Sequence, residues 1–236
     1  MNTPPLGHAL RRSLLVIGCW LAVAGNAFAA TIGSDESIRA LREALNRGAA
    51  EAVAALGKPD GFLGNAKVRI PLPEKVRDAE KLVRRLGGDK QADQLIETMN
   101  RAAEAAVVEA RPILLQSIRQ MSVKDALAIL RGGDDAATRY FRDSTSAALS
   151  DRLKPLVEAA TQKAGVARKY EKFAGKALQF GLIDADTADL DGYITARTLD
   201  GLFVMMAEEE KAIRKDPVAT GSALLRKVFG SLGGTP

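Results

Sequence analysis

We predict an all-α fold for this chain: a single domain of about eight helices, with a short extended, proline-rich segment near residues 66–73. Apolar residues recur at the three- and four-residue spacing of a buried helix face through most of the chain. Acidic residues also precede basic ones by four positions, the favourable order on an exposed helix face, at Glu43/Arg47, Glu80/Arg84, Glu97/Arg101 and Glu210/Arg214. No series of alternating apolar and polar residues indicates a sheet.

The first half of the chain predicts three or four of these helices. Ser34 can cap a helix whose apolar positions continue to residue 56, and Gly57 ends it. Pro71 and Pro73 hold residues 66–73 extended, as a strap over the core or as a short edge strand. Helices over residues 76–86 and 89–110 follow, and Pro112 kinks or restarts the second of them.

The second half of the chain continues the helical pattern. Ser122 and Asp125 have the spacing of a capping box, and that helix ends at the glycine pair 132–133. Asp134 can cap the next helix, which we expect to end near residue 149, with a separate helix over residues 153–164. Gly165 separates that helix from one over residues 166–180, and two more are expected over 194–213 and 218–229.

The N-terminus has the pattern of a cleavable secretory signal peptide, residues 1–29. Arg11 and Arg12 form a positive region, an apolar run covers residues 14–24, and alanines at 27 and 29 form a small-x-small site. We expect cleavage between Ala29 and Ala30, which leaves a single all-α domain in residues 30–236. A membrane span needs roughly 20 apolar residues, so we expect no transmembrane span in the mature chain.

Two other export signals overlap this segment. The letters VIGC match a lipobox, which would tether a lipoprotein to the cell envelope through Cys19. Because the apolar run continues past Cys19, cleavage after Ala29 is favoured. Arg11 and Arg12 also resemble a twin-arginine signal, although Leu10 stands where a small hydroxyl residue is expected.

Cleavage after Ala29 restricts the chemistry of the mature protein. It removes the only histidine, cysteine and tryptophan, which are His8, Cys19 and Trp20. A chain without them has no ligands for a structural zinc site, no Ser-His-Asp or Cys-His system and no disulfide. We therefore predict a secreted, periplasmic protein without a cofactor, and favour a role that is not enzymatic.

The charge balance argues against a nucleic-acid partner. The full chain has a formal net charge of +5, and removal of Arg11 and Arg12 brings it closer to zero. So balanced a chain lacks the basic footprint of nucleic-acid binding proteins. The partners that we expect are an envelope protein or an apolar small ligand.

The stretch DADTADLDGYITARTLDG, residues 184–201, resembles a calcium loop in its alternating acids. With Asp191 placed at position 5 of an EF-hand, position 1 is Thr187 and position 12 is Thr198, so two demanding ligands are missing. The alternative is that Asp189 or Asp191 caps the following helix, and we favour it.

Two other acidic clusters have the same kind of explanation. Asp134 and Asp135 follow a glycine pair and suit a helix start, while Glu208 and Glu209 suit a solvated helix face. The alternative is that Asp134, Asp135, Glu208 and Glu209 converge as the centre of a carboxylate-dependent enzyme assisted by Mg²⁺ or Ca²⁺.

Several long phrases of the sequence resemble one bacterial family. They include GKPDGFLGNAKVRIPLPEKV, residues 57–76, and FGLIDADTADLDGYITARTLDGLFVMMAEEEK, residues 180–211. The chain resembles domain-of-unknown-function family 4197, from about residue 34 to residue 230. The resemblance implies an exported helical protein of the Gram-negative envelope, and it supplies no catalytic residues.

The sequence thus predicts a periplasmic binding or scaffold module that is not an enzyme. Two alternatives stay open at this point. One is the carboxylate-dependent enzyme of the cell envelope, and the other is a lipoprotein tethered through Cys19.

Overall fold

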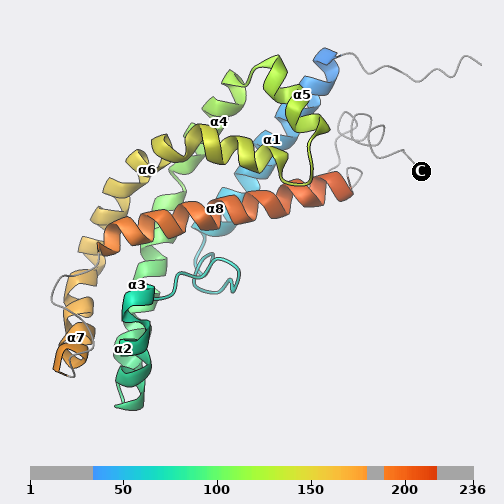
Figure 1. The fold of residues 1–236 in the computed structure, drawn as a ribbon. Helices are drawn as coiled ribbons and strands as arrows, with labels where there is room; N and C mark the ends of the chain where they lie inside the picture. The colour runs from blue at the N-terminus through green and yellow to red at the C-terminus, as the bar shows by residue number, and fades with distance from the viewer. Residues whose placement is uncertain (1–33, 180–188, 217–236) are drawn as a thin grey trace, which may run out of the picture. The chain divides into compact units, whose positions relative to one another are not determined.

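The computed structural model describes residues 34–179 and 189–216, which all belong to one compact unit, residues 32–236. Over these ranges the protein is all-α, with eight helices and no strand, which confirms the predicted fold class (Figure 1). The helices are α1 (Ser34–Gly57), α2 (Glu74–Arg85), α3 (Asp89–Val107), α4 (Ala110–Gln120), α5 (Val123–Arg131), α6 (Ala136–Ala164), α7 (Val166–Gln179) and α8 (Leu190–Lys215). The predicted signal peptide and the helix expected over residues 218–229 lie outside the described residues.

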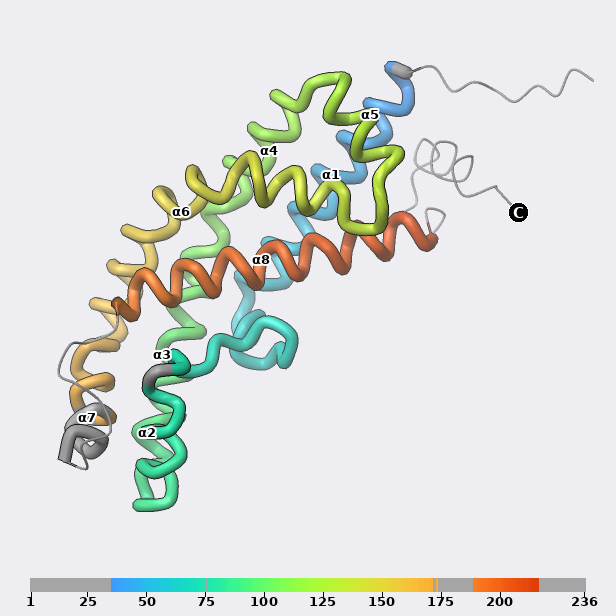
Figure 2. Tube along the Cα trace, in the orientation of Figure 1, coloured from blue at the N-terminus to red at the C-terminus, as the bar shows by residue number. Residues whose placement is uncertain are grey.

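One apolar core connects all eight helices. Helix α8 contacts α1, α3 and α6, and α6 in turn contacts α3, α4, α5 and α7. Figure 2 shows α2 and α7 beside the first half of α3, and their contacts agree with that arrangement. The largest side chains in the core are fully buried phenylalanines: Phe62, Phe141, Phe173 and Phe203. Removal of such rings from water supplies the main free energy that holds the helices together.

The segment between α1 and α2, residues 58–73, is a strap over the core and includes the proline-rich residues. Residues 58–68 form successive turns, and the chain from 69 to 73 is extended without a strand partner. Phe62, Val68, Ile70 and Leu72 of this segment are buried in the core. Of the two forms expected for residues 66–73, the structure has the strap.

Helix α6 differs from the prediction of two helices over residues 134–149 and 153–164. It is continuous from Ala136 to Ala164, with Pro155 inside it. A proline inside a helix removes one hydrogen bond and costs about 3 kcal/mol. Leu149, Leu153 and Val157 are fully buried before and after Pro155, while the proline itself is exposed. Core packing on both sides of the proline therefore keeps the helix intact, and the predicted break was wrong.

Local capping signals were predicted correctly at two helix starts. Ser122 and Asp125 form the capping box of α5, in which the Asp125 N–H donates to the Ser122 hydroxyl at 3.1 Å. Asp189 caps α8, since its carboxylate accepts from the Gly192 N–H at 2.8 Å. Asp191 accepts a hydrogen bond from the Thr161 hydroxyl at 2.7 Å. Asp189 and Asp191 of the calcium-like stretch therefore both make contacts within or between helices.

Two helical glycines give opposite expected effects when replaced by alanine. A Cβ on Gly201 would lie 2.6 Å from the Phe62 ring of the strap, whereas one on Gly48 would meet only ordinary contacts at 3.6 and 3.7 Å. Alanine gains up to about 1 kcal/mol of helix propensity over glycine, but overpacking a core costs about 1–3 kcal/mol. We expect Gly48→Ala to raise the midpoint of urea unfolding and Gly201→Ala to lower it. Equal shifts of the same sign would contradict the close approach of α8 to Phe62.

Candidate binding cleft

An apolar cleft lies between α1, α6 and α8. Its volume is about 30 Å³, or about 410 Å³ when all the space between its walls and the adjoining solvent is counted. Gly48 of α1, which has no side chain, leaves space on one wall. The apolar lining is Leu41, Ala44, Leu45, Ala49, Ala137, Phe141, Met206 and Ile213.

A buried carboxylate forms the polar part of the cleft. Glu210 of α8 is 8% exposed. Its carboxylate accepts hydrogen bonds from the backbone N–H groups of Ala137 and Thr138 and from the Thr138 hydroxyl, each at 2.9 Å. These N–H groups belong to the first turn of α6, where helical geometry leaves them without a partner in the helix. Glu210 therefore caps α6 from a different helix, and the positive end of α6 favours its charge.

Arg214 completes this polar group. Its guanidinium donates to the Glu210 carboxylate at 2.9 and 3.1 Å and to the Ile129 carbonyl at 2.9 Å. Ile129 lies near the end of α5, so the pair joins α5, α6 and α8 at one point. The carboxylate is thus fully hydrogen-bonded, which is the condition for burying a charge without a large penalty.

These contacts correct two expectations from the sequence. The Glu210/Arg214 pair was expected on an exposed face, but both side chains are largely buried. Asp134 was expected to cap α6, yet the N-cap position is Asp135, whose side chain makes no capping hydrogen bond. Glu210 performs that role instead, because the packing of α8 brings its carboxylate to the N-terminus of α6.

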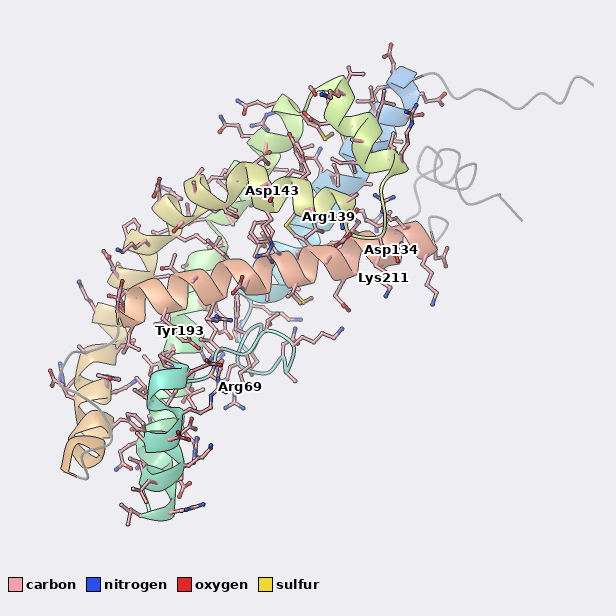
Figure 3. All side chains as sticks on the ribbon, viewed as in Figure 1. Arg69, Asp134, Arg139, Asp143, Tyr193 and Lys211 are labelled. Atoms are coloured by element: carbon pink, nitrogen blue, oxygen red, sulfur yellow. The ribbon has the colours of Figure 1, made fainter. Side chains whose placement is uncertain are left out.

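The four acids proposed as a catalytic cluster share no common partner among the described residues. Asp134 and Arg139 lie around the start of α6 (Figure 3). Asp135 forms an ion pair with Arg139 at 2.6 Å, while Glu208 pairs with Lys67 of the strap and Glu209 lies beside Glu51 of α1. Within residues 34–179 and 189–216, no group of three or more acids is placed to hold a metal ion. Asp135 and Glu208 are therefore each engaged in a separate ion pair.

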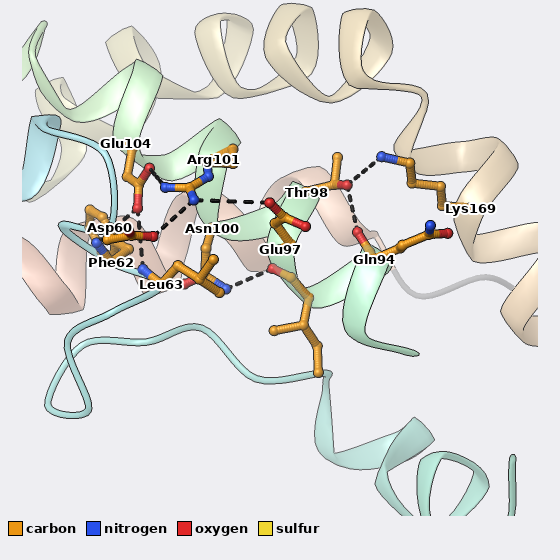
Figure 4. A network of polar contacts seen from close by, with 11 residues as sticks. Asp60, Phe62, Leu63, Gln94, Glu97, Thr98, Asn100, Arg101, Glu104 and Lys169 are labelled. Atoms are coloured by element: carbon orange, nitrogen blue, oxygen red, sulfur yellow. Dashed lines mark hydrogen bonds and ion pairs between the residues drawn. The ribbon is translucent and has the colours of Figure 1, made fainter. Parts of the chain in front are cut away.

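A second polar network holds the strap on α3 (Figure 4). The side-chain amide of Asn100 accepts from the Ile70 N–H and donates to the Ile70 and Ile96 carbonyls, all at 2.8 Å. One turn later, Glu104 accepts from the backbone N–H groups of Phe62 at 3.1 Å and Leu63 at 3.2 Å. Both side chains are at least nine-tenths buried. They supply the backbone partners that an irregular segment over a core needs.

Asn100, Glu104 and Glu210 were not predicted from the sequence as tertiary hydrogen-bonding residues. A signal for the first two was present, because both occupy the apolar stripe of α3 at i, i+4 spacing. A polar residue inside a buried stripe requires a hydrogen-bond partner. The identity of that partner depends on the tertiary fold.

Comparison with known families agrees with the resemblance seen in the sequence. The family described as "Protein of unknown function (DUF4197)" matches residues 31–230. The chain belongs to this family. The match includes all eight described helices of this DUF4197 chain, the strap and the cleft. No curated protein and no solved structure matches the chain significantly. None of its described helices is both long enough and apolar enough to cross a bilayer.

In this DUF4197 chain, the surroundings of Glu209 predict the direction in which stability changes with pH. Partial burial, and then the nearby carboxylate of Glu51, raise the pKa of Glu209 above its ordinary value. The folded chain therefore holds this proton more tightly than the unfolded chain, so stability falls as pH rises from the ordinary value through the raised pKa. We expect Glu209→Gln to raise the melting temperature at pH 7 and to change it less at pH 4. The gain in free energy of unfolding should stay below about 1 kcal/mol, because solvent screens the site.

Glu208 provides the matched control for this prediction. Its hydrogen bond and charge interaction with Lys67 lower the pKa of Glu208. A group with a lowered pKa stabilises the folded chain at pH values above its ordinary pKa. This stabilisation is lost as the pH falls through the lowered pKa. Glu208→Gln should therefore lower the melting temperature at pH 7, opposite to Glu209→Gln. If both variants shift the melting temperature at pH 7 in the same direction, the opposite pKa shifts of Glu208 and Glu209 are wrong.

Proposed function

We propose that this DUF4197 chain is a non-enzymatic binding module of the periplasm, and that its cleft between α1, α6 and α8 receives an apolar side chain of a partner protein. The observation that carries the proposal is the lining of the cleft. It is mostly aliphatic and aromatic, with one ion pair at its base. Buried interface pockets that receive one anchoring side chain have this composition and supply much of the binding energy of protein complexes.

The depth of the cleft favours a protein side chain over an apolar small ligand. Sites for small molecules enclose most of the surface of their ligand. Here the volume of the cleft is only about 30 Å³, which is too small to enclose such a ligand. A partner helix laid over α1 and α8 could insert a single apolar side chain beside Gly48 and cover the remaining opening with its own surface.

The ion pair supports binding rather than catalysis. Glu210 is the only acid that lines the cleft, and its carboxylate oxygens are already bound by α6 and Arg214. A general acid or base must be able to exchange a proton with a substrate. Glu210 instead fixes the α6–α8 contact, so that the apolar lining is preorganised for a partner.

Location in the periplasm rests on the predicted signal peptide. Mass spectrometry of the N-terminus of protein purified from cells distinguishes a chain cleaved after Ala29 from a lipoprotein that begins at Cys19. A chain beginning at Ala30 supports the soluble form, while a lipid-modified Cys19 places the same module on a membrane surface.

Site-specific photocrosslinking in cells tests the cleft as a binding site. A benzophenone amino acid would replace Ile213 at the rim of the cleft or, as a control, Val123, which is 56% exposed on α5. We expect a discrete adduct from position 213 and none of the same mass from position 123. Gly48→Leu, which fills the cleft, should abolish the adduct, whereas Gly48→Ala should retain it.

Three outcomes would overturn the proposal. They are no adduct from position 213, an adduct that persists in Gly48→Leu, and a crosslink only within the chain itself. The last outcome would show that the protein covers its own cleft. Thermal melts of the purified variants would show that Gly48→Leu remains folded, and a variant that unfolds would be replaced by Gly48→Val.

A further inference from the structure

A second cavity lies at the turn between α6 and α7, where both helices face α3. Its volume is about 300 Å³ and its lining is mainly polar. Gly165, at φ +67°, forms the turn and directs α7 back along α3. The functional groups around the cavity are three amides and three cations: Gln91, Gln94, Gln162, Lys163, Arg168 and Lys169. We call this cavity the basic basin.

The basic basin has positive charge without a balancing acid in its lining. Lys163 lies in the last turn of α6, and Arg168 and Lys169 lie in the first turn of α7. No ion pair joins any of the three to an acid in the described part of the chain. Three cations within two helical turns repel one another, and a bound anion would relieve that repulsion.

One of the cations is held in place by a neutral partner. Lys169 donates from Nζ to the hydroxyl of Thr98 at 2.6 Å, and this hydroxyl donates to the Gln94 carbonyl at 2.6 Å (Figure 4). Thr98 is buried and Lys169 is partly buried, so α3 fixes the position of the ammonium group. An ammonium has three protons to donate, and this bond uses one of them. The other two are available to a ligand.

Two further features add donors to the basin. The Gln91 side-chain oxygen is buried and has no hydrogen-bond partner within residues 34–179 and 189–216. A half-turn of this amide would present its NH₂ group to an anion, or its oxygen would accept from a ligand hydroxyl. The first N–H groups of α7 lie at the same turn, and the N-terminus of a helix favours negative charge.

We infer that the basic basin binds the phosphate group of a soluble phosphate ester or of a phospholipid headgroup. A phosphate has the charge for three cations and enough acceptor oxygens for the ammonium, guanidinium and backbone N–H groups. The basin is larger than one phosphate, so it has room for the hydroxyl-bearing part of the molecule near the amides of Gln91 and Gln94. This site lies apart from the apolar cleft and shares none of its lining residues.

The test uses protein purified from cells, with inorganic phosphate and lipid vesicles as probes. Lys163→Gln/Arg168→Gln removes two exposed charges from the basin, and Lys124→Gln/Arg131→Gln removes two exposed charges from α5 as the matched control. Calorimetry would measure phosphate affinity, for which we expect a Kd of about 1 mM or tighter. Flotation would compare phosphatidylglycerol with phosphatidylcholine vesicles. The amide resonances of residues 166–168 would report the position of the bound phosphate.

We expect phosphate binding to shift the amide resonances of residues 166–168. The affinity for phosphate should weaken at least about tenfold in the basin variant and change less than about twofold in the control. Phosphatidylglycerol binding that phosphate displaces, with the same dependence on the variants, would assign the phosphate to a lipid. Absence of binding to both probes would overturn the inference. So would equal loss in the two variants, or vesicle binding that phosphate does not displace, because each indicates general charge attraction.

Discussion

Replacing Glu210 with alanine is expected to lower the free energy of unfolding by about 3–5 kcal/mol, as for other buried ion pairs that lose one partner. The variant would leave the Arg214 guanidinium, whose side chain is 14% exposed, without its carboxylate. It would also leave the N–H groups of Ala137 and Thr138 without their acceptor at the start of α6. Each lost partner leaves a desolvated polar group, and these penalties act together.

Urea unfolding followed by circular dichroism measures this effect. Glu208→Ala is the control, since Glu208 is an exposed acid in the same helix, and it should lower stability far less than Glu210→Ala. The double variant Glu210→Leu/Arg214→Met should recover part of the loss, because an apolar pair leaves no unpaired charge. If Glu210→Ala and Glu208→Ala are equally stable, Glu210 does not hold α6 to α8.

Replacing Asn100 with alanine is expected to lower the free energy of unfolding by about 2–4 kcal/mol. Asn100 is fully buried and makes both backbone hydrogen bonds of Ile70. The variant would leave this N–H and this carbonyl without partners inside the protein, together with a small cavity. It would also release the part of the strap that contributes Ile70 and Leu72 to the core.

Hydrogen exchange shows whether this loss arises at the strap. The Ile70 amide should exchange much faster in Asn100→Ala than in the unmodified protein, while amides in the middle of α6 should change only with global stability. Asn100→Leu separates the effect of the lost hydrogen bonds from that of the cavity, because leucine keeps most of the side-chain volume but cannot form the hydrogen bonds. Asn65→Ala, which removes a partly buried strap amide, is the milder control. If the Ile70 amide stays protected in Asn100→Ala, Asn100 does not hold the strap on α3.

The sequence predicted those features that depend on near neighbours in the chain. Helical periodicity located the helices, and the Ser122–Asp125 capping box needs only residues within one turn. Pro112 was predicted to kink or restart the helix, and the structure has the restart, since α3 ends at Val107 and α4 begins at Ala110. Each of these features follows from local backbone geometry.

The features that were missed depend on partners far away in the sequence. Glu104 binds backbone N–H groups about 40 residues earlier, and Glu210 binds the start of α6 more than 70 residues earlier. Helix spacing alone placed Glu210 on an exposed face, because it cannot show which surface a second helix covers. Pro155 is the reverse case, in which packing outweighs a local signal for a break.

The two buried glutamates have one physical role in common. Each carboxylate accepts backbone N–H groups from a segment that has no partner of its own, at the strap for Glu104 and at the α6 N-terminus for Glu210. Each is also paired with an arginine in its own helix, Arg101 or Arg214. The acids most deeply buried in the described chain thus hold segments of the fold together.

Mass spectrometry of the crosslink from position 213 tests the proposed use of the apolar cleft most directly. The peptide joined to the benzophenone identifies both the occupant and the side chain that enters. We predict a peptide from another envelope protein, attached through an apolar residue with apolar neighbours at helical spacing. A peptide from residues 217–236 of the same chain, or attachment through a charged residue, would contradict the account.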